Sequence, residues 1–169
     1  MDQLWSPWRS AYLQREHERD AEGCFLCVCA SGVEMTEQNL VVARFEHTVV
    51  LMNRYPYNAG HLLVAPIVHH GDLATLDTAI SAELMSTTQM ALRAVGSVLS
   101  PHGCNVGINL GTDAGAGVPD HVHVHIVPRW RGDTNFMPVL ADVRMVGTRL
   151  EDLWRSYVTA FAEQCEDPS

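Results

Sequence analysis

Apolar and polar residues alternate strictly in one segment of the chain, which runs from His121 to Ile126. Successive side chains of a β-strand point to opposite faces, so residues two apart share a face. The segment therefore predicts a strand with valines on one face and a row of three imidazoles on the other (His121, His123 and His125). Because imidazole changes its charge near neutral pH, this row is the first candidate for chemistry.

Other short apolar runs predict the remaining strands of a sheet. Four of them are bounded by turn residues and have strand length: Leu40–Ala43, Thr48–Met52, His61–Ile67 and Cys104–Leu110. Only four residues separate the first two runs, which indicates a hairpin. The residues 53–60 contain Pro56 and Gly60 and predict a loop, and Gly111–Gly117 predicts a flexible loop leading into the histidine segment.

Two further segments have the period of a helix. Between Thr78 and Leu99, apolar or small residues recur at spacings of three and four: Ile80, Leu84, Thr88, Ala91, Val95 and Val98. Leu150–Ala162 predicts a second helix, with Thr148 and Glu151 as its capping box, and Glu163–Ser169 is expected to fray. Together these elements predict an α+β fold, a mainly antiparallel sheet packed by one long helix, with a C-terminal helix.

Length and composition fit one globular domain. The chain has 169 residues, of which 47% are hydrophobic, so it can bury a proper core. We expect an N-terminal arm over residues 1–22, with Trp5, Trp8 and Tyr12 as aromatic anchors, and a catalytic domain over residues 23–142. The residues 143–169 would form the C-terminal helix and tail.

Charge and hydropathy exclude several classes of protein. The formal net charge is −9 and the chain has no stretch rich in Lys or Arg, which argues against a non-specific nucleic-acid binder. No apolar run approaches the roughly 18 residues that a membrane span needs, and the N-terminus does not resemble a signal peptide. We therefore expect a cytoplasmic protein without nucleic-acid or membrane partners. A small anionic substrate remains compatible with this charge, because a few local donors can hold a phosphate.

The five cysteines include one pair with the spacing Cys-x-x-Cys, Cys24 and Cys27. Such a pair can be half of a zinc site, a redox pair or a chance occurrence. No βαβ pattern of the thioredoxin type surrounds it, so zinc is the better interpretation of the two chemical ones. Disulfides are a poor expectation without a secretory signal.

The spacing of the three histidines is compatible with catalysis, with metal binding or with a structural role. The neighbouring loop Gly111–Gly117 is rich in glycine, which lets backbone N–H groups approach an anion closely. Beside three imidazoles, this loop indicates a phosphate cradle next to a nucleophile.

The segment His121–Arg129 resembles the signature of the histidine triad (HIT) superfamily of nucleotidyl hydrolases and transferases. Three more segments are similar to that family: residues 53–56 with 60–66, residues 109–115, and residues 4–9 with Trp130–Pro138. The last of these resembles the Fhit-like branch of diadenosine polyphosphate hydrolases and phosphorylases, in its bacterial form.

The resemblance implies a role for each matching residue. His123 would be the nucleophile that forms a covalent nucleotidyl-imidazole, with a backbone carbonyl holding its second nitrogen. His125 would donate to the phosphate or the leaving group, and His61 or His121 would support the arrangement. The implied substrate contacts are Asn53 to the ribose, Asn109 to phosphate, and the loop residues Gly115, Ala116 and Gly117.

The resemblance also implies a structural zinc site made by Cys24, Cys27, His69 and His121. Two thiolates and two imidazoles would close a tetrahedral shell, which leaves no open position for a substrate. The sequence leaves open whether the metal is bound, and it implies no organic cofactor.

The function implied by the resemblance is cleavage of dinucleoside polyphosphates, such as diadenosine tri- or tetraphosphate, by water or by phosphate. Three alternatives stay open: a nucleoside phosphoramidase or adenylyl hydrolase, an enzyme that uses the same covalent chemistry on an unusual phosphoester, and a nucleotide-binding module without turnover. The resemblance further implies a homodimer or a tetramer.

Overall fold

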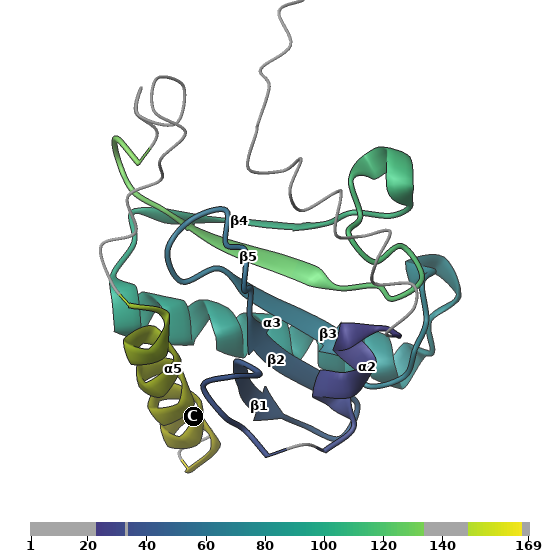
Figure 1. Cartoon of the computed structure of the whole chain (residues 1–169), viewed down its shortest axis with the longest axis horizontal. Helices are drawn as coiled ribbons and strands as arrows, with labels where there is room; N and C mark the ends of the chain where they lie inside the picture. The colour runs from purple at the N-terminus through teal and green to yellow at the C-terminus, as the bar shows by residue number, and fades with distance from the viewer. Residues whose placement is uncertain (1–22, 33, 134–148, 167–169) are drawn as a thin grey trace, which may run out of the picture.

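Five strands form one antiparallel sheet in the order β1-β2-β3-β5-β4 (Figure 1). Their bounds are β1 Val41–Arg44, β2 Thr48–Met52, β3 Leu62–Pro66, β4 Gly103–Ile108 and β5 Val124–Arg129. The computed structural model describes residues 23–32, 34–133 and 149–166. The expected N-terminal arm, the capping residue Thr148 and the residues 134–138 of the tail motif lie outside this part of the chain.

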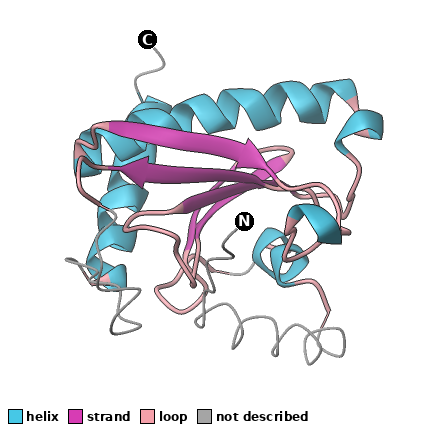
Figure 2. Cartoon of the chain, turned by 90° about the horizontal axis from the view of Figure 1, so that it is seen from above, coloured by secondary structure: helices cyan, strands magenta, loops and turns pink. Residues whose placement is uncertain are grey.

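The long helix α3 (Thr78–Leu99) covers one face of the sheet (Figure 2). The side chain of Asp77 caps its start by accepting hydrogen bonds from the backbone of Ala79 and Ile80. The predicted apolar stripe of the helix faces Val50, Val64, Val124 and Ile126 of the sheet in the main hydrophobic core. The α+β fold with a helix-covered antiparallel sheet is therefore confirmed.

A smaller core lies on the opposite face of the sheet. Leu26 of a short helix, α2 (Phe25–Ala30), is fully buried there against Val49, Leu51 and Leu63. The sequence did not predict this helix, whose six residues are too few to display a helical period. Cys27 lies within it, and Cys24 precedes it.

The prediction of one strand carrying all three histidines is wrong. Strand β5 begins at Val124, so only His125 lies within it, while His121 and His123 lie in the segment before it. The reason is that β4 ends at Ile108, the partner of Val124, and that pairing with β3 also stops at Val124, although β3 itself continues to Pro66. The backbone N–H of Val122 instead donates to the carbonyl of His70, outside the sheet.

Helix α5 spans Leu150–Glu166, so the expected fraying from Glu163 is wrong for the described residues. Gln164 explains the extra turn, because its side chain accepts a hydrogen bond from Arg93 and donates to the carbonyl of Met90, both in α3. The loop Gly111–Gly117 is also more ordered than predicted, with a short 3-10 helix, η2 (Thr112–Ala114). Another 3-10 turn, η1 (Leu73–Thr75), precedes α3.

Helix α5 also reaches the loop that precedes β3. The hydroxyl of Tyr157, which is fully buried, donates a hydrogen bond to the carbonyl of Gly60 at 2.9 Å. Gly60 has φ +75°, a conformation that favours glycine, and it directly precedes His61. The C-terminal helix therefore helps to position a histidine of the candidate site. In the part of the chain that the structure covers, no helix is long and apolar enough to cross a membrane.

Candidate active site

The central histidine of the row, His123, is held in one tautomer. Its Nδ1 lies 2.8 Å from the backbone carbonyl of His121, and a carbonyl can only accept a hydrogen bond. Nδ1 therefore carries the proton, and Nε2 keeps its lone pair. The ring is 5% exposed, and burial lowers its pKa, so His123 is a neutral imidazole with a fixed nucleophilic nitrogen.

A second hydrogen-bond chain fixes the tautomer of His125. The backbone N–H of Tyr57 donates to Nδ1 of His61 at 3.1 Å, so the proton of that ring lies on Nε2. Nε2 of His61 then donates to Nδ1 of His125 at 3.0 Å. Nε2 of His125 is consequently an N–H donor, and it is buried with no hydrogen-bond partner among the described residues.

Asn53 belongs to this chain. Its Oδ1 accepts a hydrogen bond from the backbone N–H of Tyr55, which orients the amide so that Nδ2 faces Nδ1 of His61 at 3.3 Å. Two donors thus converge on the same nitrogen of His61. The structure places Asn53, expected from the resemblance to contact ribose, beside this histidine.

Sequence analysis missed Tyr57. Its ring stacks on His61 at a centroid distance of 4.8 Å and on His125 at 5.7 Å. The ring thereby covers two of the histidines while its backbone sets their tautomers. An aromatic residue inside a loop rich in Pro, Asn and Gly, four residues before His61, was the available signal.

Acidification is expected to destabilise the fold through His125. Burial lowers the pKa of His125 from 6.5 to about 4, and repulsion from His123, when that ring is protonated, lowers it further in the same direction. The unfolded chain binds this proton near pH 6.5 and the folded chain only near pH 4, so the free energy of unfolding falls as pH falls through this window. Denaturant unfolding at a series of pH values measures this slope.

The matched variant for this measurement is His125→Gln, which cannot titrate. Its slope between pH 6.5 and 4 should be shallower than that of the wild type, although not flat, because burial also lowers the pKa values of His121 and His123. Equal slopes in the two proteins would contradict the assignment to His125.

His121 faces a different set of residues. Its Nε2 lies 2.9 Å from the carbonyl of Pro66, so Nε2 carries the proton and Nδ1 is free to act as a ligand. Nδ1 lies 3.3 Å from Sγ of Cys24 and 3.5 Å from Sγ of Cys27, and Nδ1 of His69 lies 3.1 Å from Sγ of Cys27. The four ligand atoms all lie within 4.8 Å of one another.

This arrangement divides the histidine row between two centres. The ring of His121 belongs to the group of cysteines and histidine, whereas its backbone carbonyl holds the nucleophilic ring of His123. His123 and His125 remain together, with ring centroids 4.8 Å apart.

Part of the backbone of the glycine loop is already hydrogen-bonded within the loop. The N–H of Gly115 donates to Thr112, and that of Ala116 donates to Gly111. Asn109 donates to the carbonyl of Gly115 at 3.3 Å, and Gly117 is half-buried. The backbone N–H groups of residues 115 and 116 are therefore already used within the loop, and the loop is not an open cradle of N–H donors at these two positions.

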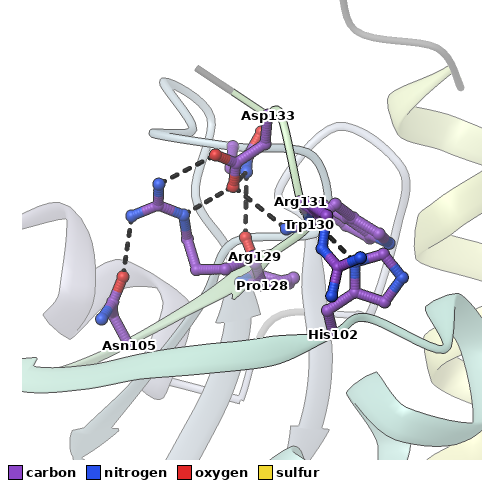
Figure 3. A network of polar contacts seen from close by, with 8 residues as sticks. His102, Asn105, Pro128, Arg129, Trp130, Arg131 and Asp133 are labelled. Atoms are coloured by element: carbon purple, nitrogen blue, oxygen red, sulfur yellow. Dashed lines mark hydrogen bonds and ion pairs between the residues drawn. The ribbon is translucent and has the colours of Figure 1, made fainter.

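A groove of about 260 Å³ leads away from His125 along strands β4 and β5. A polar network closes its far end (Figure 3). There the guanidinium of Arg129 binds both carboxylate oxygens of Asp133, at 2.6 and 2.9 Å, and donates to Oδ1 of Asn105 at 2.9 Å. Asp133 also accepts hydrogen bonds from Asn58 and from the backbone of Trp130.

Comparison with known proteins agrees with this geometry. A protein-family model described as the HIT domain matches residues 34–132. This range includes His123, His125 and the residues that line the groove. The chain belongs to the HIT family. It is 39% identical over 168 residues to an AP-4-A phosphorylase of Mycobacterium tuberculosis, an alignment that covers 97% of this chain and 86% of that protein.

Other HIT proteins are similar over smaller parts or at lower identity. An asymmetrical bis(5'-nucleosyl)-tetraphosphatase of Schizosaccharomyces pombe is 34% identical over 93 residues, which cover 55% of this chain and 50% of that protein. The crystal structure of a zinc-bound histidine triad family protein from Mycobacterium smegmatis superposes with a TM-score of 0.67 at 26% identity. It covers 86% of this chain and 98% of that one.

Proposed function

We propose that this HIT protein cleaves dinucleoside polyphosphates through a covalent nucleotide on Nε2 of His123. One observation carries the proposal: the rings of His123 and His125 have centroids 4.8 Å apart, and hydrogen bonds to their Nδ1 atoms leave a lone pair on Nε2 of His123 and, on Nε2 of His125, an N–H without a partner among the described residues. A nucleophile next to a donor is what displacement at a phosphoanhydride requires. The 39% identity with an AP-4-A phosphorylase over nearly the whole chain supports this substrate class.

In the first step, Nε2 of His123 attacks the phosphorus next to one nucleoside, and the bond from that phosphorus to the bridging oxygen breaks. The electron pair leaves with the departing nucleotide, whose oxygen accepts a hydrogen bond from Nε2 of His125. The imidazolium formed at His123 is stabilised by its Nδ1–H bond to the carbonyl of His121. Because the hydrogen bonds are in place beforehand, little reorganisation is needed in the transition state.

In the second step, an oxygen of water or of inorganic phosphate attacks the same phosphorus, and the bond to Nε2 breaks. Water would yield AMP, and phosphate would yield ADP. The similarity to a phosphorylase favours phosphate as the acceptor.

Incubation with diadenosine tetraphosphate, with and without phosphate, tests this function. We expect ADP and ATP when phosphate is present, as measured by chromatography of the products. AMP and ATP under both conditions would identify water as the acceptor. Intact substrate under both conditions would refute the proposed function.

We further propose that Cys24, Cys27, His69 and His121 hold a structural zinc ion. Tetrahedral bonds of about 2.3 Å to sulfur and 2.1 Å to nitrogen place ligand atoms about 3.6 Å apart. The sulfur–nitrogen separations of 3.1, 3.3 and 3.5 Å agree with that spacing. Burial and the neighbouring Cys24 raise the pKa of the Cys27 thiol, so a cation is needed to keep two adjacent thiolates. A similar structure is that of a zinc-bound protein.

Cys27→Ser is expected to lose this zinc and a corresponding part of the stability. A metal that binds only the folded chain adds about 4 kcal/mol at 1,000 times its dissociation constant. Metal analysis and thermal unfolding measure the two effects, and Cys165→Ser, at an exposed cysteine of α5, is the matched control. Equal zinc content in the two variants would contradict the site.

The outer edge of β4 supports a proposal of a homodimer. Strand β4 forms the end of the sheet and is mostly exposed, with Val106 at 48% and the nearby Leu110 at 47% exposure. An edge of this kind can pair with a second copy. Light scattering should give twice the mass of the chain, and Val106→Lys should lower the measured mass.

We also propose a cytoplasmic location, because none of the five cysteines forms a disulfide bond.

A further inference from the structure

The groove beyond His125 has two ends of different chemistry. In strand β5, His125, Val127 and Arg129 point to the same face, and Gly107 and Asn105 of β4 lie opposite the first two. All five residues line the groove. His125 and Arg129 are four residues apart, so the groove extends for about 13 Å from the reacting centre.

The near end carries donors for an anion. Nε2 of His125 is an N–H with no partner among the described residues, and Asn109, whose amide also donates to the carbonyl of Gly115, lines the same groove. Phosphate groups that leave with the departing nucleotide would meet these donors first.

The far end offers a flat surface with little net charge. The charge of Arg129 is compensated by the two-point contact with Asp133, which makes this guanidinium a poor anion site. The same contacts, with that to Asn105, hold the guanidinium plane in a fixed orientation (Figure 3). Val127, the partner of Asn105, adds apolar surface beside it, whereas Tyr57 stacks on His125 at the near end. A fixed guanidinium stacks well on an uncharged aromatic ring system, and a nucleobase is such a ring system.

We propose that this groove binds the second nucleoside of the substrate, the one that leaves with its phosphates. The inference rests on the proposed function and extends it to substrate selection. An amine leaving group, as in a nucleoside phosphoramidate, would leave the groove empty, whereas a nucleoside polyphosphate matches both of its ends. The groove therefore selects dinucleotides over mononucleotide derivatives.

A substitution at Gly107 tests this proposal without removing any side-chain hydrogen bond, because glycine has no side chain. Gly107 lines the groove, and a Cβ atom added there meets no other atom of the described residues within 4 Å, so the side chain of Gly107→Val can enter the groove. Gly96, in helix α3, has equally open surroundings among the described residues and lies outside the groove, which makes Gly96→Val the control. Gly107→Ala provides a smaller side chain if the valine variant does not fold.

The experiment compares the dissociation constants of AMP and of a non-hydrolysable diadenosine tetraphosphate analogue with methylene bridges, measured by calorimetry. The wild type and Gly96→Val should bind the analogue more tightly than AMP. In Gly107→Val the dissociation constant of AMP divided by that of the analogue should fall at least tenfold, because only the analogue reaches into the groove. Gly107→Ala should give an intermediate ratio.

Two results would overturn the inference: a wild type that binds the analogue no more tightly than AMP, or an unchanged ratio in both Gly107 variants. Neither result would refute the proposed function, because that function is tested separately by the product assay with and without phosphate. Failure of that assay together with a reduced ratio in Gly107→Val would instead refute the reaction and support the groove.

Discussion

His123→Asn is expected to abolish turnover of diadenosine tetraphosphate, with a loss of at least about 10³-fold in kcat. The asparagine amide can still donate to the carbonyl of His121, so the local structure is preserved, but it has no nucleophilic nitrogen. The rate of product formation in the steady state measures the loss. Mass spectrometry of acid-quenched enzyme should detect AMP on the wild-type chain and none on the variant.

The matched control is His47→Asn, which removes an imidazole from the turn before β2, away from the site. Its turnover should equal that of the wild type. Normal turnover by His123→Asn, or an AMP adduct on another residue of the wild type, would contradict the role of His123.

Gly60→Ala is expected to destabilise the fold by about 2–4 kcal/mol, because strain and steric overlap add at this position. The φ of +75° disfavours any residue with a Cβ. That Cβ would also overlap Leu99 and lie 2.6 Å from the hydroxyl of Tyr157. The tyrosine cannot easily yield, because it is buried and bonded to the carbonyl of Gly60 itself. Denaturant unfolding measures the loss.

Gly32→Ala separates the two causes. Gly32 has a similar φ of +83°, but a Cβ there meets no atom within 4 Å, so only the backbone cost of about 1 kcal/mol is expected. Equal losses in the two variants would exclude a steric contribution at Gly60. Because Gly60 precedes His61, kcat of Gly60→Ala should also fall under conditions in which the variant is fully folded.

Periodicity in the sequence was sufficient to predict most of the fold. The stripe between Thr78 and Leu99 predicted α3 to the residue, and the run Thr48–Met52 did the same for β2. These elements are long or regular enough for local pattern to specify them, since one buried face must recur at every turn or every second residue. The short helix α2 and the last turn of α5 were missed because contacts with distant residues stabilise them.

The resemblance of His121–Arg129 to a known signature also named the residues on which the proposals rest. Pattern alone, however, placed the three histidines on one strand. The strand begins only at Val124, where its pairing with both neighbouring strands stops, and no property of the alternating segment itself records where that pairing stops.

The sequence by itself determined which reactive groups are available, namely imidazoles in a row and two thiols three residues apart. It also determined the fold class, a sheet covered by a long helix. Only the tertiary structure decided which nitrogen of each ring holds a proton and toward which centre each ring turns. The physical reason is that a tautomer follows its hydrogen-bond partner, and these partners are the backbone of Tyr57, the carbonyls of Pro66 and His121, and the ring of His61. Apart from His121, they come from segments that chain folding alone brings to the histidines.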